Sequence, residues 1–234
     1  MDFTFSELDE SLRDGVRAVL EARCSPATIR AAWNAEPGAT DRGAWDALAE
    51  VGVLDALVPE DQGGVGLDER SVVLVFQAAG YSGLPDPLIE TAAFAARLLG
   101  PHYAGSRTMV TTNVGSGPEG DLAPWAADAD LLLLMAPDGA IHVRPPEAVT
   151  LIPAEAVDRS RRLWRVQWEP GPAELDAAAT DVARAVDRAT LAAAAELVGL
   201  GERMLDMTVG YVSQREQFGT RIGAFQAIKH RLAD

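Results

Sequence analysis

The chain has 234 residues, 48% of them hydrophobic, so it can bury one or two sizeable cores. Its formal net charge of −15 argues against nucleic acid or an anionic membrane surface as a partner, but not against a local basic pocket for an anionic cofactor. Cys24 is the only cysteine, which excludes an intrachain disulfide and indicates a reducing compartment. Because no apolar run approaches about 18 residues and no signal peptide opens the chain, we expect a cytoplasmic protein.

The first part of the chain alternates helical patterns with turn residues. Side chains that accept hydrogen bonds from free backbone N–H groups, or a proline suited to a first turn, mark where helices begin. The predicted helix starts are Ser6 with Asp9, Ser25-Pro26, Asp41, Asp68 and, for an Ala-rich helix running to Leu99, Leu88. A Gly-rich stretch at residues 63–67 lacks the spacing of known phosphate-binding loops, so we interpret it as a structural turn. We predict an all-helical N-terminal domain over residues 1–106.

The composition changes after Arg107. Thr, Gly and Ser dominate residues 108–121, and residues 131–136 form a continuous apolar run of strand length. A Pro-Asp-Gly turn follows, and then come segments with alternating polarity at residues 141–144, 149–152 and 163–168. These patterns predict a middle antiparallel β-domain of about four to six strands over residues 107–173. A basic segment, Asp158-Arg159-Ser160-Arg161-Arg162, is expected to form a turn before the last strand.

The remaining residues, 174–234, are predicted to be the first helices of a C-terminal helical bundle. A helical region from Leu175 to Phe218 forms one long helix or two helices joined before Asp187. Apolar side chains recur on one face of it at helical spacing, and an uncovered face of this kind favours aggregation. The residues of this face are Leu197, Leu200, Met204, Thr208 and Tyr211.

The end of that helix carries a candidate anion site. We expect Gly219 to cap the helix in the left-handed conformation, with Arg215 in its last turn. A second helix should begin near Ala224, with Gln226 in its first turn. A guanidinium group, an amide and free helix N–H groups would then converge, as a phosphate or diphosphate requires. The alternative is that Gly219 is only a cap and that Phe218 belongs only to the core.

The same residues carry a family resemblance. The pattern Arg215-x-x-Phe218-Gly219-x-x-Ile222-x-x-x-Gln226, followed by residues 228–234, resembles the C-terminal signature of the acyl-CoA dehydrogenases. The resemblance implies a helical, β, helical domain order and FAD-dependent α,β-desaturation of acyl-CoA thioesters, with electron-transfer flavoprotein as the acceptor. It also implies that Arg215, Phe218 and Gln226 bind the cofactor, with the Arg and Gln contacting the FAD of a neighbouring subunit.

The catalytic base of the family has no equivalent that we can assign. In many members it is a Glu in a part of the bundle beyond the position of Asp234. In others it lies on the helix before the Arg-x-x-Phe-Gly motif, where the equivalent position is near Ala189. Because Glu196 and Glu202 lie elsewhere on this helix, we name no catalytic residue.

The middle segment also departs from the family. The Tyr-x-x-Thr-Glu-Pro and Trp-Ile-Thr strands that line the flavin are missing, and residues 108–113 are a poor substitute. The chain is similar in this to the flavin-site-degenerate subunit of actinobacterial α2β2 acyl-CoA dehydrogenases, several of them linked to sterol side-chain degradation. We therefore hypothesise a hetero-oligomer with a second such subunit. The alternatives are a flavin-free scaffold and a single-subunit homotetramer that continues beyond Asp234. No histidine pair has metal-ligand spacing, and no metal is predicted.

Overall fold

The computed structural model describes residues 4–39, 41–103, 105–113, 116–117, 120–171, 175 and 177–234. Its principal helices are α1 (Glu7–Arg23), α2 (Pro26–Asn34), α3 (Gly43–Glu50), α4 (Glu69–Ser82), α5 (Ala96–Leu99), α6 (Ala179–Val212) and α7 (Gln226–Ala233). Short 3-10 turns are η1 (Glu60–Gln62), η3 (Gly100–His102), η4 (Pro146–Ala148), η5 (Arg159–Arg161) and η6 (Ile222–Ala224). Within the described ranges, no helix is long and apolar enough to cross a membrane.

Local capping chemistry explains where the N-terminal helices begin. Ser6 and Asp9 form a reciprocal capping box at α1, with the Asp9 amide donating to Ser6 Oγ at 3.2 Å. Ser25 with Pro26 begins α2, and Asp68 begins α4, so these three predictions are confirmed. The prediction for Asp41 is wrong by one position. Residue 42 is the N-cap of α3, and Asp41 instead accepts from the Gly43 amide at 2.9 Å.

The predicted Ala-rich helix from Leu88 to Leu99 is helical but not uniform. Its first part, η2 (Ile89–Ala95), is a π-helix, and α5 completes it. All of η2 except Ile89 is buried. The Thr91 hydroxyl on η2 donates to the Val110 carbonyl of β1 and accepts from the Val110 amide. Such wide turns let a helix aim side chains that a regular spacing would misplace.

The middle region contains two small sheets. One has the order β1-β4-β5, formed by Val110–Thr112, Leu131–Met135 and Ile141–Arg144. The other has the order β2-β3-β7-β6, formed by Ser116–Gly117, Gly120–Pro124, Leu163–Gln167 and Thr150–Pro153. The predicted antiparallel pairing is wrong for β1 and β4, which are parallel. The chain passes through β2 and β3 of the second sheet before it returns to β4, so it arrives in the same direction as β1.

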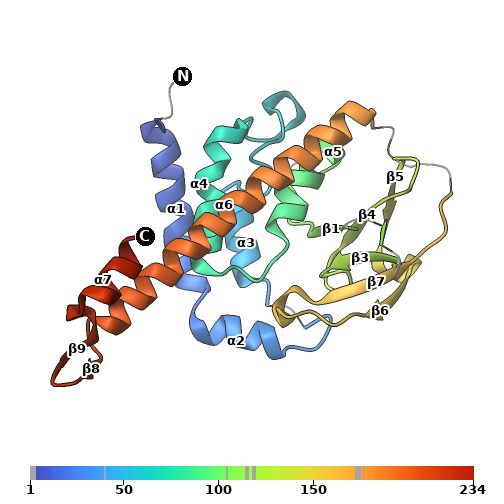
Figure 1. The fold of residues 1–234 in the computed structure, drawn as a ribbon. Helices are drawn as coiled ribbons and strands as arrows, with labels where there is room; N and C mark the ends of the chain where they lie inside the picture. The colour runs from blue at the N-terminus through green and yellow to red at the C-terminus, as the bar shows by residue number, and fades with distance from the viewer. Residues whose placement is uncertain are drawn as a thin grey trace.

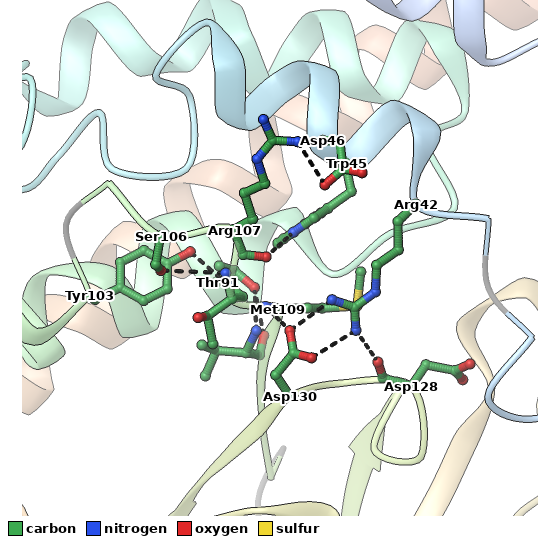
Figure 2. Close-up of polar contacts among 12 residues, drawn as sticks. Arg42, Trp45, Asp46, Thr91, Tyr103, Ser106, Arg107, Met109, Asp128 and Asp130 are labelled. Carbon is green, nitrogen blue, oxygen red and sulfur yellow. Dashed lines mark hydrogen bonds and ion pairs between the residues drawn. The ribbon is translucent and has the colours of Figure 1, made fainter.

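Polar contacts hold the β-region against the N-terminal helices (Figure 2). Arg42, just before α3, makes a bidentate contact with Asp130, with Nη–Oδ distances of 2.8 and 3.0 Å. Asp130 also accepts from the Met109 amide at 2.7 Å, and Trp45 Nε1 donates to the Arg107 carbonyl at 2.8 Å. One apolar cluster includes residues of the helices and of β1, β4 and β5, so the two regions share a core.

A single helix, α6, connects the β-region to the C-terminal hairpin and α7 (Figure 1). It is continuous over 34 residues, so the alternative of a join before Asp187 is wrong. It packs against α4 through small buried residues, among them Ala192, Ala195 and Gly199. From this crossing onward the helix exposes a run of apolar side chains, and its last part extends past the N-terminal helices (Figure 1). The exposed side chains are Leu197, Val198, Leu200, Met204, Leu205, Met207, Val209 and Tyr211.

Candidate functional site

The predicted anion site lies where α6 ends, but its local structure differs from the prediction. The helix stops at Val212, and the Arg215 amide donates to the Tyr211 carbonyl at 2.9 Å, so Arg215 follows the helix instead of lying in its last turn. Phe218 and Gly219 have φ values of 55° and 76°, the left-handed conformation that a two-residue hairpin turn demands at both central positions. The chain therefore reverses as a short hairpin of β8 (Glu216–Gln217) and β9 (Thr220–Arg221). Gly219 is the second residue of a turn, not a helix cap.

The hairpin leads directly into α7. The Ile222 amide donates to the Arg215 carbonyl at 2.8 Å, which closes the base of the hairpin. Phe225 is the N-cap of α7, and no side chain caps this end of the helix. Gln226 is the first residue of α7, as predicted for its first turn, although the helix begins two residues after Ala224. The corner thus presents an uncapped helix N-terminus close in sequence and structure to Arg215.

The three predicted cofactor-binding residues are all exposed at this corner. Phe218 is 92% exposed, and its ring meets that of Phe225 edge to face, with 6.3 Å between ring centroids. It is therefore not a core residue of this chain. Within the part of the chain that the structure describes, the side chains of Arg215 and Gln226 make no hydrogen bond or ion pair. Their donors are available for a ligand or for another polypeptide.

A second group of polar residues lies between η2, α6 and the basic turn, and Glu90 is its buried member. Arg161 on η5 lies 3.6 Å from Glu90 on η2, measured from Nη2 to Oε1, and 5.8 Å from the Trp125 ring centroid. Burial raises the pKa of Glu90, and burial followed by the negative charge of Glu90 raises the pKa of Glu196 to about 8. Burial is the largest cause in both cases, so each carboxyl group holds its proton to a higher pH than a free glutamic acid does.

Sequence reasoning did not assemble this acidic group. The only local signal for Glu90 is its place in an otherwise apolar, Ala-rich helix, where an unpaired carboxylate is unexpected. The sequence predicts Arg161 in a basic turn, and nothing local brings it beside Glu90. Glu196 does not occupy the position near Ala189, so the family pattern assigns it no role. Ala189 itself is partly buried on α6, and Glu196 lies seven residues further along the same helix, about two turns away.

Comparison with known proteins places this architecture in a family. The description "Acyl-CoA dehydrogenase, N-terminal domain" matches residues 6–100, and "Acyl-CoA dehydrogenase, C-terminal domain" matches residues 180–234. The acyl-CoA dehydrogenase IpdE2 of Mycolicibacterium smegmatis is 33% identical over 231 residues, which cover 98% of this chain and 72% of that protein. FadE27 of Mycobacterium tuberculosis is 30% identical over 280 residues, which cover 100% of this chain and 72% of that protein. The chain therefore belongs to the acyl-CoA dehydrogenase family.

A solved structure supports the same fold. A chain of the ChsE4-ChsE5 complex from Mycobacterium tuberculosis superimposes with a TM-score of 0.81 at 24% identity, covering 100% of this chain and 74% of that chain. The predicted fold class, mainly helical with a small β-region between helical parts, is confirmed. The positions of Arg215, Phe218 and Gln226 as cofactor contacts stay predictions.

Proposed function

We propose that this chain is one subunit of an FAD-dependent acyl-CoA dehydrogenase in which a second, different chain of the same family helps to complete each flavin site. The observation that carries the proposal is the exposed corner between α6 and α7. Arg215 and Gln226 are held there by a closed hairpin and an adjoining helix, and their side chains have no partner among the described residues. A chain that used these groups for its own stability would bury or pair them.

The donor set at this corner suits the diphosphate of FAD. Arg215 offers a planar guanidinium, Gln226 offers an amide, and the uncapped start of α7 offers backbone N–H groups. The exposed Phe218 ring can cover an apolar part of a ligand or of a neighbouring subunit. When bound, FAD supplies the hydride acceptor for α,β-desaturation of an acyl-CoA thioester, and electron-transfer flavoprotein would then take its electrons.

The requirement for a second chain is supported by the apolar surface of α6. Leu197 is 68% exposed, and Met204 and Met207 are each 61% exposed, all on the C-terminal half of α6. Large exposed apolar surfaces of this kind mark contacts with other polypeptides. The missing flavin-lining strands of the middle region favour a hetero-oligomer over a homotetramer, and so does the fold shared with a chain from a two-protein complex.

The acyl group is assigned by class only. We infer a lipid or sterol side-chain thioester as the substrate, because the resemblance extends to subunits linked to such degradation. Within this chain we name no catalytic base, because the position near Ala189 carries no carboxylate.

Co-expression tests the proposal. The chain should be purified alone and with a second acyl-CoA dehydrogenase chain encoded beside it, and bound flavin should be measured by its visible absorbance in both preparations. We expect a yellow complex that oxidises acyl-CoA. Arg215→Ala should weaken FAD binding by about 1.5–3 kcal/mol, the contribution of a hydrogen bond to a charged group.

Arg231→Ala is the matched control, because Arg231 is an exposed arginine in the last turn of the same helix α7. It should leave the flavin content unchanged. Equal flavin content in the Arg215→Ala and wild-type complexes would contradict the role of the corner. A colourless complex would instead favour a non-catalytic partner that keeps the fold without the cofactor.

A further inference from the structure

A cleft of about 510 Å³ is lined by residues of the first part of α6, at the opposite end of that helix from the corner described above. Three arginines line it, Arg97 at the end of α5 and Arg184 and Arg188 on the first part of α6. Arg184 and Arg188 are four residues apart, so they lie on one face of the helix. Such a concentration of positive charge is unusual in a chain whose net charge is −15.

The carboxylates at this cleft only partly compensate the arginines. Glu69 lies 3.9 Å from Arg188 and Asp181 lies 3.9 Å from Arg184, in each case measured from a carboxylate oxygen to Nη1. Both distances are beyond those of a hydrogen bond. Among the described residues that line the cleft, three guanidinium groups therefore face two carboxylates.

Arg188 is the least expected of these groups because its side chain is only 7% exposed. Within the described ranges it makes one hydrogen bond, from Nε to the Ala93 carbonyl at 3.3 Å, besides the long contact with Glu69. Burial and then the neighbouring Arg97 charge lower the pKa of Arg188, so the two cations repel each other in the absence of an anion. Buried charges are normally paired or bind a charged ligand.

The start of α6 adds to this positive potential. Ala177 and Asp181 line the cleft, and the N-cap residue Ala178 has no side chain that can accept from the first amides of this 34-residue helix. Gln62 on η1 also lines the cleft and supplies an amide. The volume lies within the range of small-molecule sites and far exceeds the space that a single phosphate ion needs.

From this geometry we infer that the cleft between η1, α5 and the N-terminal part of α6 binds a small molecule that carries a diphosphate group. Arg97 on α5 and Arg184 on α6 line it from two different elements, together with the buried Arg188. Fork-shaped donors on separate elements can hold two phosphoryl groups at once. The cleft is separate from the corner between α6 and α7, since Arg215 and Gln226 do not line it.

Titration calorimetry on the purified full chain tests the inference, with sodium pyrophosphate, ADP and sodium sulfate as the injected probes. We expect one pyrophosphate per chain, bound at least tenfold more tightly than sulfate. ADP should bind as well; tighter binding of ADP assigns the ligand as a nucleotide, and equal binding assigns the diphosphate group itself as the recognised part. Failure of pyrophosphate to bind, or binding no tighter than that of sulfate, overturns the inference.

The decisive variant is Arg97→Gln with Arg184→Gln, because both side chains are exposed and their loss should leave the fold intact. We expect pyrophosphate affinity to fall at least tenfold. The control with the same change in net charge is Arg23→Gln with Arg30→Gln, two exposed arginines of α1 and α2. An equal loss in both double variants would reveal a general charge effect and contradict the site. The flavin content of the assembled complex should not change in either variant.

Discussion

Gly80 on α4 lies directly against the carbonyl oxygen of Glu196 on α6, at the point where the two helices cross. A Cβ atom at Gly80 would overlap with that oxygen, and one at Gly199 would overlap with the Gln77 carbonyl. Side-chain hydrogen bonds continue the contact further along both helices, from Gln77 to Glu202 at 2.7 Å and from Tyr81 to Asp206 at 2.8 Å. The crossing therefore holds α6 against the N-terminal helices and has no room for a methyl group.

Gly80→Ala should destabilise the fold by about 1–3 kcal/mol, the usual cost of inserting a methyl group into a closely packed contact. Helix propensity alone would predict the opposite change in the free energy of unfolding, because it favours Ala over Gly by about 1 kcal/mol. Urea denaturation followed by circular dichroism measures the change. Gly201→Ala on α6 is the control, because no atom lies within 4 Å of a Cβ there, and it should be neutral or stabilising. A Gly80→Ala protein as stable as the wild type would contradict the close crossing.

The free energy of unfolding should depend on pH through the carboxyl group of Glu196, whose pKa is affected by Glu90 and Arg161. Its pKa is raised from 4.5 to about 8 in the folded chain, chiefly by burial. Between these values the folded state keeps a proton that the unfolded state has released, so stability falls as pH rises through this window and is level above it. A tenfold change in the acid dissociation constant corresponds to about 1.4 kcal/mol.

Glu196→Gln keeps the shape of the side chain without its titration. The variant should unfold at the same temperature as the wild type near pH 5 and at a higher temperature at pH 9, a gain of about 1–3 kcal/mol. Thermal unfolding followed across this range is the measurement. Glu216→Gln, at an exposed position of the hairpin, should leave the curve unchanged. Parallel curves for Glu196→Gln and the wild type would rule out a buried neutral carboxyl group.

A buried ion pair joins the turn before β7 to the turn between β3 and β4. Arg162 Nη1 lies 2.6 Å from Asp128 Oδ1, with side-chain exposures of 7% and 0%, and the same oxygen accepts from the Gly38 amide at 2.8 Å. Asp128→Ala should cost about 3–5 kcal/mol, because it removes a buried countercharge of the Arg162 guanidinium. The free energy of unfolding in urea measures this. Asp14→Ala breaks the exposed contact between Arg13 and Asp14, and it should cost less than about 1 kcal/mol. Similar losses in both variants would refute the special role of burial.

Whether a feature could be predicted from the sequence depends on how far apart along the chain its interacting residues lie. The starts of α1, α2 and α4 depend on residues within three or four positions, so Ser6, Ser25 and Asp68 identify them. The parallel pairing of β1 with β4 depends on a chain path through another sheet, which no local pattern reveals. At Phe218-Gly219 two local rules competed, and hairpin turn chemistry prevailed over helix capping because both residues, not only the glycine, adopt positive φ.

The same distinction applies to the candidate sites: one lies within a short motif, and the others are assembled from distant parts of the chain. Arg215 and Gln226 belong to a motif that spans 12 positions, so their joint placement at one corner could be predicted from the sequence. The group of Glu90, Glu196 and Arg161 could not, because its members come from η2, α6 and η5, and only the tertiary fold brings them together. The arginines of the cleft at the start of α6 were missed for the same reason.

The apolar surface on the C-terminal half of α6, from Leu197 to Tyr211, should control assembly with a second chain. Burial of an exposed Leu or Met side chain contributes about 1.5–3 kcal/mol, so several of them can stabilise a subunit contact. Leu197→Glu with Met204→Glu should leave the unfolding temperature of the isolated chain unchanged, because both side chains are largely exposed. The same variant should prevent formation of the complex with the co-expressed chain, as measured by sedimentation velocity. Gln214→Glu, an exposed polar position just beyond the end of α6, is the control and should assemble normally. Normal assembly of the Leu197 and Met204 double variant would show that the contact between subunits lies on another surface.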